Sequence, residues 1–339
     1  MCKRLHTEVA VLSSKMTRLI DVAKLAKVST ATVSRVINNN GYVSARVKER
    51  VLKAIEELGY QPARAARFLA KSRQNFEVNI LADDWVLKSI TTVLDEFYSI
   101  VHKGIIDFSK NHRMNVHLRS VNSWDKNADG FLLIGGGITK ELVKEVKATK
   151  KPVVLVDQYL PGLKVDYVVS DGYDGAVFAV DRLISKGLKR IVHIHGPLSH
   201  FGFRDRYDGY IATMERHGFM PKSYEFDEVS DNMGVIIDMM LRSYGKPEAI
   251  FGSNDTAAIR AMEELKLRGF KIPDDVSIVG FDDIMSASLV SPKLTTLKIF
   301  KYDLGSIAGR RLFNLLMGEE RHPVKISLFT QYIERESTI

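Results

Sequence analysis

Between residues 19 and 59, apolar side chains recur at helical spacing in three short runs that polar turns separate. The apolar positions of these runs are Val22, Ala23, Leu25 and Ala26; Val33, Val36 and Ile37; and Val47, Val51, Ile55 and Leu58. Ser29 and Ser44 stand directly before the second and third runs, where serine caps a helix, and Gly59 ends the third. The pattern predicts three short helices with a tight turn between the first two, which is a helix-turn-helix.

The second run, TATVSRVIN, has too little apolar surface for an ordinary core helix. Burial of its apolar stripe turns the polar positions outward. Outward residues near the start of such a helix reach base edges in the major groove, and short hydroxyls beside backbone N–H groups hold phosphates. We therefore predict that the DNA-contacting residues of this segment are Ser29, Thr30, Ala31, Thr32, Ser34, Arg35 and Asn38. The alternative is a plain three-helix bundle with a solvated face.

The excess of positive charge lies entirely in the amino-terminal part of the chain. Residues 1–75 hold 15 Lys/Arg against 5 Asp/Glu, a balance of +10, whereas residues 76–339 hold 34 against 36, a balance of −2. A basic segment that also has a folded pattern is typical of a nucleic-acid-binding domain. Residues 1–16 precede the first patterned run, and we expect a disordered tail or a true start at Met16.

From residue 76 onward, short β-rich runs such as VNILA, GFLLIGG and RIVHIHG alternate with amphipathic helical stretches. This alternation predicts an α/β body with a doubly wound parallel sheet, and about 260 residues are more than one core accommodates, so we expect two lobes. Ligands of such sheets bind at the carboxyl ends of strands. That rule points to Asp157, Asn254 and Asp282, which stand at predicted strand ends.

The predicted organisation is a helix-turn-helix domain over 17–61, a basic linker over 62–75 and an α/β body over 76–339. Within the body, we expect a first lobe of about 76–170 plus 300–322 and a second lobe of about 171–299 plus 323–339.

Several other classes of function find no support in the sequence. The single cysteine, Cys2, excludes an intrachain disulfide, and no apolar run reaches the length of a membrane span or a secretory signal, so we expect a cytoplasmic protein without a membrane partner. His193 and His195 alternate on a predicted buried strand, which favours packed histidines over metal ligands. The glycines at 135–137 predict a turn, because no phosphate-binding pattern accompanies them. We expect no enzyme, metal or cofactor.

The segment Leu19–Ala70, LIDVAKLAKVSTATVSRVINNNGYVSARVKERVLKAIEELGYQPARAARFLA, resembles the DNA-binding head of the lactose/galactose repressor (LacI/GalR) family. The resemblance implies that Thr30 and Ala31 select the base sequence and that Arg35 reads a guanine through its two-pronged guanidinium. It also implies that the basic linker is a hinge helix, in which Leu69 wedges into the minor groove and Arg64 helps to neutralise phosphates.

The body resembles the same family, and through it the periplasmic sugar-binding fold, in VVLVDQ, RIVHIHGPL, FRDRYDGY, FGSNDTAAIRAMEELKLRGFKIPDD, GFDD and PKLTTLK. The resemblance implies that Arg204, Asn254 and Asp282 bind an effector and that Asp157 lies at the lobe interface. A carboxylate and a guanidinium that face one cavity suit a polyhydroxylated ligand. The alternative for Arg204 and Asp282 is a structural ion pair, and for Asp157 a purely structural role.

Between LRSVNSWDK and ADGFLL the chain is too short for the helix that the family inserts there. This shortened lobe resembles a subgroup that includes β-galactosidase-operon repressors, which points to galactose or a galactoside. The resemblance implies a homodimeric repressor on a pseudo-palindromic DNA operator, controlled by a sugar. The alternatives are a purine- or nucleoside-responsive co-repressor-type regulator, a sugar-binding transport protein, against which the basic head argues, and a sugar-modifying enzyme, for which the sequence shows no paired-carboxylate motif.

Overall fold

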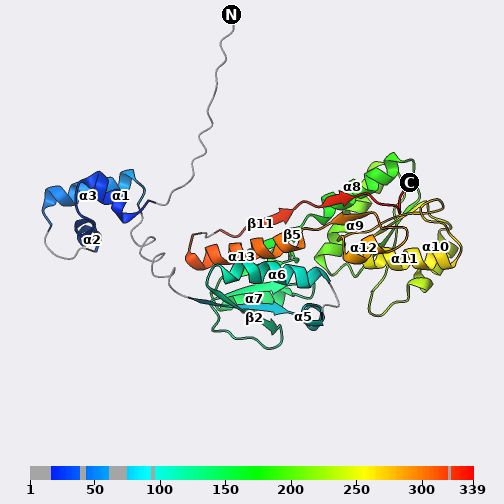
Figure 1. The fold of residues 1–339 in the computed structure, drawn as a ribbon, viewed down its shortest axis with the longest axis horizontal. Coiled ribbons are helices and arrows are strands. Elements are labelled where there is room, and N and C mark those ends of the chain that lie inside the picture. Colours follow the sequence, from blue (N-terminus) through cyan, green and yellow to red (C-terminus); the bar gives the residue numbers. More distant parts are fainter. Residues whose placement is uncertain (1–16, 39–42, 61–74, 93–95, 320–321) are drawn as a thin grey trace, which may run out of the picture. The chain divides into compact units, whose positions relative to one another are not determined.

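The computed structural model describes residues 17–38, 43–60, 75–92, 96–319 and 322–339. The chain divides into two compact units, Met1–Gln74 and Asn75–Ile339 (Figure 1).

The described part of the first unit is a helix-turn-helix followed by a third helix: α1 (Leu19–Ala26), α2 (Thr30–Asn38) and α3 (Ala45–Glu57). Val22, Val33 and Val51, one from each helix, are fully buried against one another, as the periodicity predicts. The turn between α1 and α2 is tight because Lys27 adopts a left-handed conformation, with φ 54°. Leu25, counted above among the apolar positions, is exposed instead. The other apolar residues of the three helices still form a small hydrophobic core.

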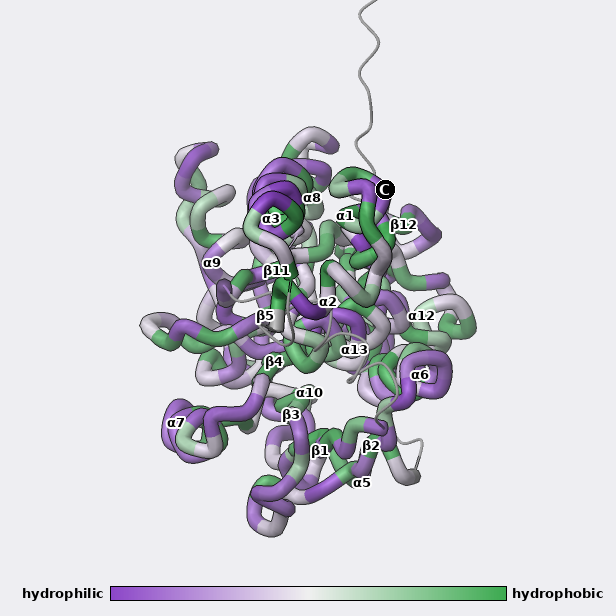
Figure 2. The backbone as a smooth tube through the Cα atoms, turned by 90° about the vertical axis from the view of Figure 1, so that its left-hand side faces the viewer, coloured by the Kyte–Doolittle hydropathy of each residue, from purple (hydrophilic) through white to green (hydrophobic). Residues whose placement is uncertain are grey.

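Caps set where these helices begin. The Ser29 Oγ accepts a hydrogen bond from the Thr32 backbone N–H at 3.1 Å, so Ser29 is the N-cap that the sequence predicts. Ser44 occupies the N-cap position of α3, but its side chain makes no capping hydrogen bond. The helices α3 and α7 (Lys140–Ala148) both carry hydrophilic and hydrophobic residues along their length (Figure 2), as expected for helices with one buried face.

The first lobe of the body is a parallel six-stranded sheet in the order β11-β5-β4-β3-β1-β2. Its strands are β1 (Phe76–Ala82), β2 (Met114–Ser120), β3 (Gly130–Ile134), β4 (Val153–Val156), β5 (Asp166–Ser170) and β11 (Lys325–Leu328). The helices α5 (Asp84–Thr92), α6 (Glu96–Lys110), α7 and α13 (Lys301–Met317) surround it. The helices α6 and α13 lie side by side (Figure 1), and a Cβ on Gly305 would lie 2.0 Å from the Val101 carbonyl oxygen. Only glycine permits that approach.

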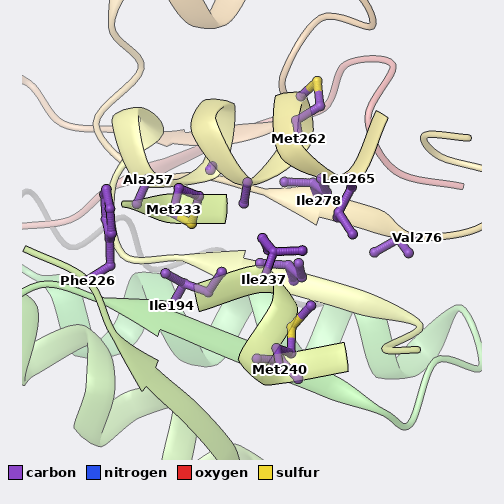
Figure 3. Close-up of a cluster of buried hydrophobic side chains, with 14 of the residues drawn as sticks. Ile194, Phe226, Met233, Ile237, Met240, Ala257, Met262, Leu265, Val276 and Ile278 are labelled. Atoms are coloured by element: carbon purple, nitrogen blue, oxygen red, sulfur yellow. The ribbon is translucent and has the colours of Figure 1, made fainter. Parts of the chain in front are cut away.

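The second lobe is a parallel four-stranded sheet in the order β7-β6-β8-β9. Its elements are β6 (Ile191–His195), β7 (Lys222–Glu225), β8 (Ala249–Gly252), β9 (Ser277–Val279), α8 (Gly172–Ser185), α9 (Phe201–Arg216), α10 (Met233–Ser243), α11 (Asp255–Leu267) and α12 (Met285–Leu289). Side chains of α10 and α11 meet strand residues such as Ile194 and Ile278 in a buried apolar cluster on one face (Figure 3). An antiparallel pair, β10 (Thr296–Lys298) and β12 (Gln331–Ile333), completes the lobe. The two-lobed, doubly wound prediction is confirmed.

The lobe boundaries differ from the expected ones at the carboxyl end. The sequence predicts residues 323–339 in the second lobe, but β11 pairs in parallel with β5 and so extends the first sheet. Only the segment that contains β12 returns to the second lobe. An exposed, half-polar strand such as KISL carries no pattern that tells which of two sheets it joins.

The connection from β2 to β3 contains no helix: residues 121–129 form turns and irregular chain. Two contacts hold it on the sheet. The Asn79 side-chain amide donates to the Asp125 carbonyl oxygen at 3.0 Å, and Trp124 packs edge-on against Phe131 with 5.2 Å between ring centroids. The shortened first lobe that the sequence predicts is therefore observed. Throughout the described ranges, no helix has the length and apolarity needed to cross a membrane.

Candidate functional site

The helix α2 presents one exposed polar face. Val33 and Val36 are buried, while Thr30, Ala31 and Arg35 are exposed. Ala31 and Arg35 are one turn apart and therefore share a face. A small methyl, a hydroxyl and a guanidinium thus stand together on the first two turns of a short helix, which is the arrangement the sequence predicts for contact with base edges.

The other predicted DNA contacts have different settings. Ser29 is exposed, and its hydroxyl also lies 2.9 Å from the Thr32 hydroxyl. Thr32 and Ser34 are half-buried. The side chain of Asn38, and the whole of Arg64 and Leu69, lie outside the described residues, as do residues 62–74 of the predicted linker 62–75.

In the body, the carboxyl ends of the two sheets face each other. Gly136, just after β3, approaches His200, just before α9, so closely that a Cβ there would lie 2.6 Å from the imidazole Cγ. At the first residue of α12, the Met285 backbone N–H donates to the Glu96 carboxylate of α6 at 2.8 Å. Residues that follow strands of both sheets therefore come together between the lobes, where ligands of open α/β sheets bind.

Arg206 of α9 is the central charged group of the second lobe. It is only 4% exposed, and its Nη2 donates to the Asp282 carboxylate at 3.0 Å. Its Nη1 donates to the Ser253 carbonyl oxygen, and the guanidinium lies 3.9 Å from the Phe281 ring centroid. The Nε of Arg206 is buried without a hydrogen-bond partner. A buried donor that lacks a partner is costly in a folded protein, so it marks a place for an acceptor.

Asp282 lies in the loop after β9, three residues beyond Val279, in a strained backbone conformation with φ 104°. Burial raises the pKa of the Asp282 carboxyl, and the Arg206 charge opposes that rise. Lys301, at the start of α13 in the first lobe, donates its ammonium to the Asp282 carbonyl oxygen. Arg206 of the second lobe thus binds the Asp282 carboxylate, and Lys301 of the first lobe binds the Asp282 backbone carbonyl oxygen.

Asn254 and Asp255 link this loop to α11. The Asn254 side-chain oxygen caps the helix by accepting the Ala257 N–H at 2.9 Å, and its amide nitrogen donates to the Glu228 carboxylate. The Asp255 carboxyl is fully buried and accepts the Ile284 N–H at 2.8 Å. Burial, reinforced by the negative charge of Asp282, raises the pKa of Asp255 to about 8. Asp255 therefore holds the loop after β9 in a mostly protonated form at neutral pH.

Asp157 belongs to the first lobe, directly after β4, in a left-handed conformation with φ 57°. Its carboxylate accepts the Tyr98 hydroxyl at 2.9 Å, and Tyr98 in turn packs edge-on against Trp85. Trp85 remains 48% exposed. The sequence predicts Asp157 at this position but neither Tyr98 nor Trp85, which extend the contacts of Asp157 within the first lobe.

Arg204, predicted to grip the effector, does not reach this group. Its side chain is exposed, and its Nε donates to the Leu198 carbonyl oxygen at 2.8 Å. Arg206, two residues on, is the arginine that pairs with Asp282. The signal that distinguishes them is helical periodicity, because Gly209 and Tyr210 lie three and four residues after Arg206 and are buried with it.

The two histidines of β6 are packed, as expected. His193 is fully buried, with Nδ1 at 2.7 Å from the Phe251 carbonyl oxygen and its ring stacked on that of Phe251. Burial lowers the pKa of His193 to about 3, so it is neutral. The His195 Nδ1 lies 2.8 Å from the Gly196 carbonyl oxygen. Among the described residues, no cluster of His, Cys, Asp or Glu has the arrangement of a metal site.

Two family models match this chain. Residues 18–63 match the model of bacterial regulatory proteins of the lacI family, and residues 180–338 match a periplasmic binding protein-like domain. The ribose operon repressor of Halalkalibacterium halodurans is 30% identical over 335 residues, which cover 95% of this chain and 97% of that protein.

Solved structures agree with this assignment. The fold is similar to the transcriptional regulator CelR in complex with cellobiose, with a TM-score of 0.71, 27% identity and coverage of 95% of this chain and 99% of that one. It is also similar to the lac repressor dimer bound to operator and the anti-inducer ONPF, with a TM-score of 0.69, 25% identity and coverage of 96% and 100%. The chain therefore belongs to the LacI family of bacterial regulatory proteins.

Proposed function

We propose that this protein is a transcriptional repressor that inserts α2 into the major groove of an operator. The observation that carries this proposal is the exposed face of Thr30, Ala31 and Arg35 on a short helix whose other face is buried. The head that contains it has a charge balance of +10 over residues 1–75, which suits a polyanion. Arg35 would contact a guanine, while Ser29, Thr32, Ser34 and Asn38 would contact the backbone.

The operator affinity is set by a small sugar that binds between the lobes. Arg206, Asn254 and Asp282 supply donors and acceptors from the second lobe, and Asp157 supplies a carboxylate from the first. The unpartnered Nε of Arg206 supports a ligand oxygen at this place. Relatives named for ribose and cellobiose support a sugar as the class of effector. The short β2–β3 connection makes galactose or a galactoside the first candidate.

Two copies of the chain bind a pseudo-palindromic operator. The lac repressor structure, described as a dimer on its operator, supports this state. In this chain, Met285 and Leu289 on α12 are 64% and 74% exposed, which gives an apolar surface for a second copy. The linker 62–75, with Leu69 in the minor groove and Arg64 on a phosphate, would transmit a sugar-dependent change in the lobes to the DNA.

The contact between Glu96 and the Met285 N–H gives the coupling a physical route. It joins α6 of the first lobe to α12, the helix that carries the exposed apolar residues. A sugar that favours one arrangement of the lobes therefore also favours one arrangement of α12. An effector shifts the equilibrium only by its difference in affinity for the two states.

Selection of random duplex DNA on the purified protein tests the proposal. We expect recovery of an inverted repeat, with an affinity over random DNA that falls steeply as salt rises. Arg35→Ala should lose the preference for the repeat while retaining salt-sensitive binding. Recovery of no inverted repeat would contradict the proposal.

A further inference from the structure

The turn after β3, residues 135–137, brings the first turn of α5 and the second lobe to the same place. A Cβ on Gly135 would lie 2.7 Å from the Val86 Cγ2 of α5. A Cβ on Gly136 would lie 2.6 Å from the His200 imidazole, as described above. Because the turn consists of glycines, α5 approaches it from the first lobe and His200 from the second. The first turn of α5 therefore lies beside the space between the lobes.

Asp83 fixes where α5 begins. Its carboxylate accepts the Val86 backbone N–H at 2.8 Å, and a Cβ on Gly137 would lie 2.1 Å from one of its oxygens. Trp85 stands between Asp83 and Val86 in the chain, so its side chain projects from this anchored turn. Figure 1 shows α5 at the end of the first lobe that is turned toward the second lobe. Trp85 is therefore held at the edge of the proposed effector site.

The indole of Trp85 offers a large aromatic surface at this edge. Its ring lies perpendicular to that of Tyr98, with an interplanar angle of 88° and 5.7 Å between the ring centroids. Such a contact covers at most one of the two indole faces, and Trp85 remains 48% exposed. The Tyr98 hydroxyl donates to the Asp157 carboxylate at 2.9 Å. The aromatic surface of Trp85 is thus joined through one buried ring to a carboxylate of the proposed site.

The proposed effector contacts of the second lobe are all polar. Arg206, Asn254 and Asp282 offer donors and acceptors, which bind hydroxyl groups. A pyranose ring also has a face made of C–H groups, which gains nothing from such contacts and is stabilised by an apolar surface. The face of an aromatic ring carries negative partial charge, which attracts the positively polarised C–H groups of a sugar. The exposed indole of Trp85 supplies this missing apolar surface.

We propose that Trp85 stacks on the C–H face of a pyranose effector and forms the first-lobe wall of the site. The inference rests on the proposed sugar-binding function and specifies the form of the ligand. The ligand is a sugar ring with one apolar face, because an open-chain alditol with the same hydroxyls has no such face. Binding of the ring removes indole surface from water, which adds affinity that hydrogen bonds to the second lobe do not supply.

Tryptophan fluorescence of the full-length protein tests this inference directly. The chain has two tryptophans, Trp85 and Trp124, and Trp124 packs against Phe131 in the β2–β3 connection. In Trp124→Phe, the emission therefore comes from Trp85 alone. The probes are galactose, methyl β-galactoside, glucose and ribose, with galactitol, glucitol and ribitol as open-chain counterparts.

We expect a sugar that raises the melting temperature to shift the Trp85 emission to shorter wavelength over the same concentration range, because the indole loses contact with water. The corresponding alditol should require at least about tenfold higher concentration for either effect. An alditol that binds as tightly as its sugar would overturn the requirement for a ring.

Trp85→Ala should weaken binding of the stabilising sugar about tenfold while leaving the melting temperature without sugar nearly unchanged, because the side chain is exposed. Trp85→Phe, which keeps a smaller aromatic face, should recover part of the affinity. Trp124→Phe is the matched control and should bind the sugar as the unaltered protein does.

A sugar that raises the melting temperature without changing the Trp85 emission would overturn this inference while leaving the proposed sugar effector intact. Undiminished binding of that sugar by Trp85→Ala would do the same. If no sugar raises the melting temperature of the unaltered protein, the proposed sugar effector fails, and this inference fails with it.

Discussion

The face of α2 and the site around Arg206 both contain an arginine, but one of these arginines is exposed and the other is buried and paired. Arg35 is exposed on a helix of the basic head, and its partner is the operator that we propose. Arg206 is buried in the nearly neutral body and already holds Asp282, Ser253 and Phe281. Arg35 can be altered without cost to folding, whereas Arg206 is part of the buried structure of the second lobe. Binding and stability should therefore separate at Arg35 and change together at Arg206.

The largest effect should come from Arg206→Leu. Removing the guanidinium leaves the Asp282 carboxylate without its ionic partner, and breaking such a buried pair costs roughly 3–5 kcal/mol. Chemical denaturation should show this loss in the free energy of unfolding, and sugar should no longer raise the melting temperature.

Arg204→Ala is the matched control for that change. The Arg204 side chain is exposed, so the free energy of unfolding should change by less than about 0.5 kcal/mol, with effector binding retained. If Arg204→Ala abolished effector binding while Arg206→Leu did not, the assignment of the two arginines would have to be reversed.

Arg35→Ala should show the opposite behaviour. The loss of a two-pronged contact to one guanine should weaken operator binding by about 1–3 kcal/mol. The free energy of unfolding and the binding of sugar should stay as they are, because Arg35 is exposed and buries no charge. Fluorescence anisotropy with labelled operator, alongside thermal unfolding, measures both quantities. A matching loss of sugar affinity would contradict the separation between the two regions.

Asp255→Asn should change how stability depends on pH. The folded pKa of Asp255, about 8, lies above that of an unfolded aspartate, about 3.9, so folding takes up a proton between these values. Asp255 therefore contributes least to the free energy of unfolding at high pH. Its contribution falls by up to about 1.4 kcal/mol per pH unit from roughly pH 4 to 8.

In Asp255→Asn, the pH dependence of the free energy of unfolding that comes from Asp255 should disappear, even if this variant is less stable at every pH. Urea denaturation from pH 5 to 8 measures the slope for both proteins. Identical slopes would show that Asp255 is ionised in the fold.

The smallest expected effect is the difference in stability between two serine variants of the head. Ser29→Ala removes an observed capping hydrogen bond and should cost about 1 kcal/mol, whereas Ser44→Ala removes a side chain that makes no capping bond and should cost less. Thermal unfolding of the two variants gives the comparison. An equal or larger loss for Ser44 would mean that its hydroxyl caps α3 in solution.

How much the sequence predicted also differs between these two regions. In the head, local periodicity was sufficient: the spacing of Val33 and Val36 determines which residues of α2 face outward, and Ser29 marks where the helix begins. The ends of the strands were predicted just as directly, because Asp157 and Asp282 follow unbroken apolar runs.

Other parts of the body depend on distant partners that no local pattern reveals. Family likeness alone pointed to Arg204, and the helical face shared by Arg206 and Tyr210 identifies the buried residue instead. Neither the pairing of β11 with β5 nor the contact between Glu228 and Asn254 has a local signal, because each joins segments far apart in the chain. The hydrogen bond between Tyr98 and Asp157 likewise joins residues far apart in the sequence, so no local pattern predicts it.

We propose that an exposed helix in the head binds an operator while a buried ionic site in the body controls that binding. Its most direct test is a titration of the selected inverted-repeat duplex with unaltered protein, with and without the sugar that stabilises it. We expect salt-sensitive, sequence-preferring binding whose affinity changes with the sugar. This change in affinity should vanish in Arg206→Leu and persist in Arg204→Ala. Operator affinity that no stabilising sugar alters would contradict it.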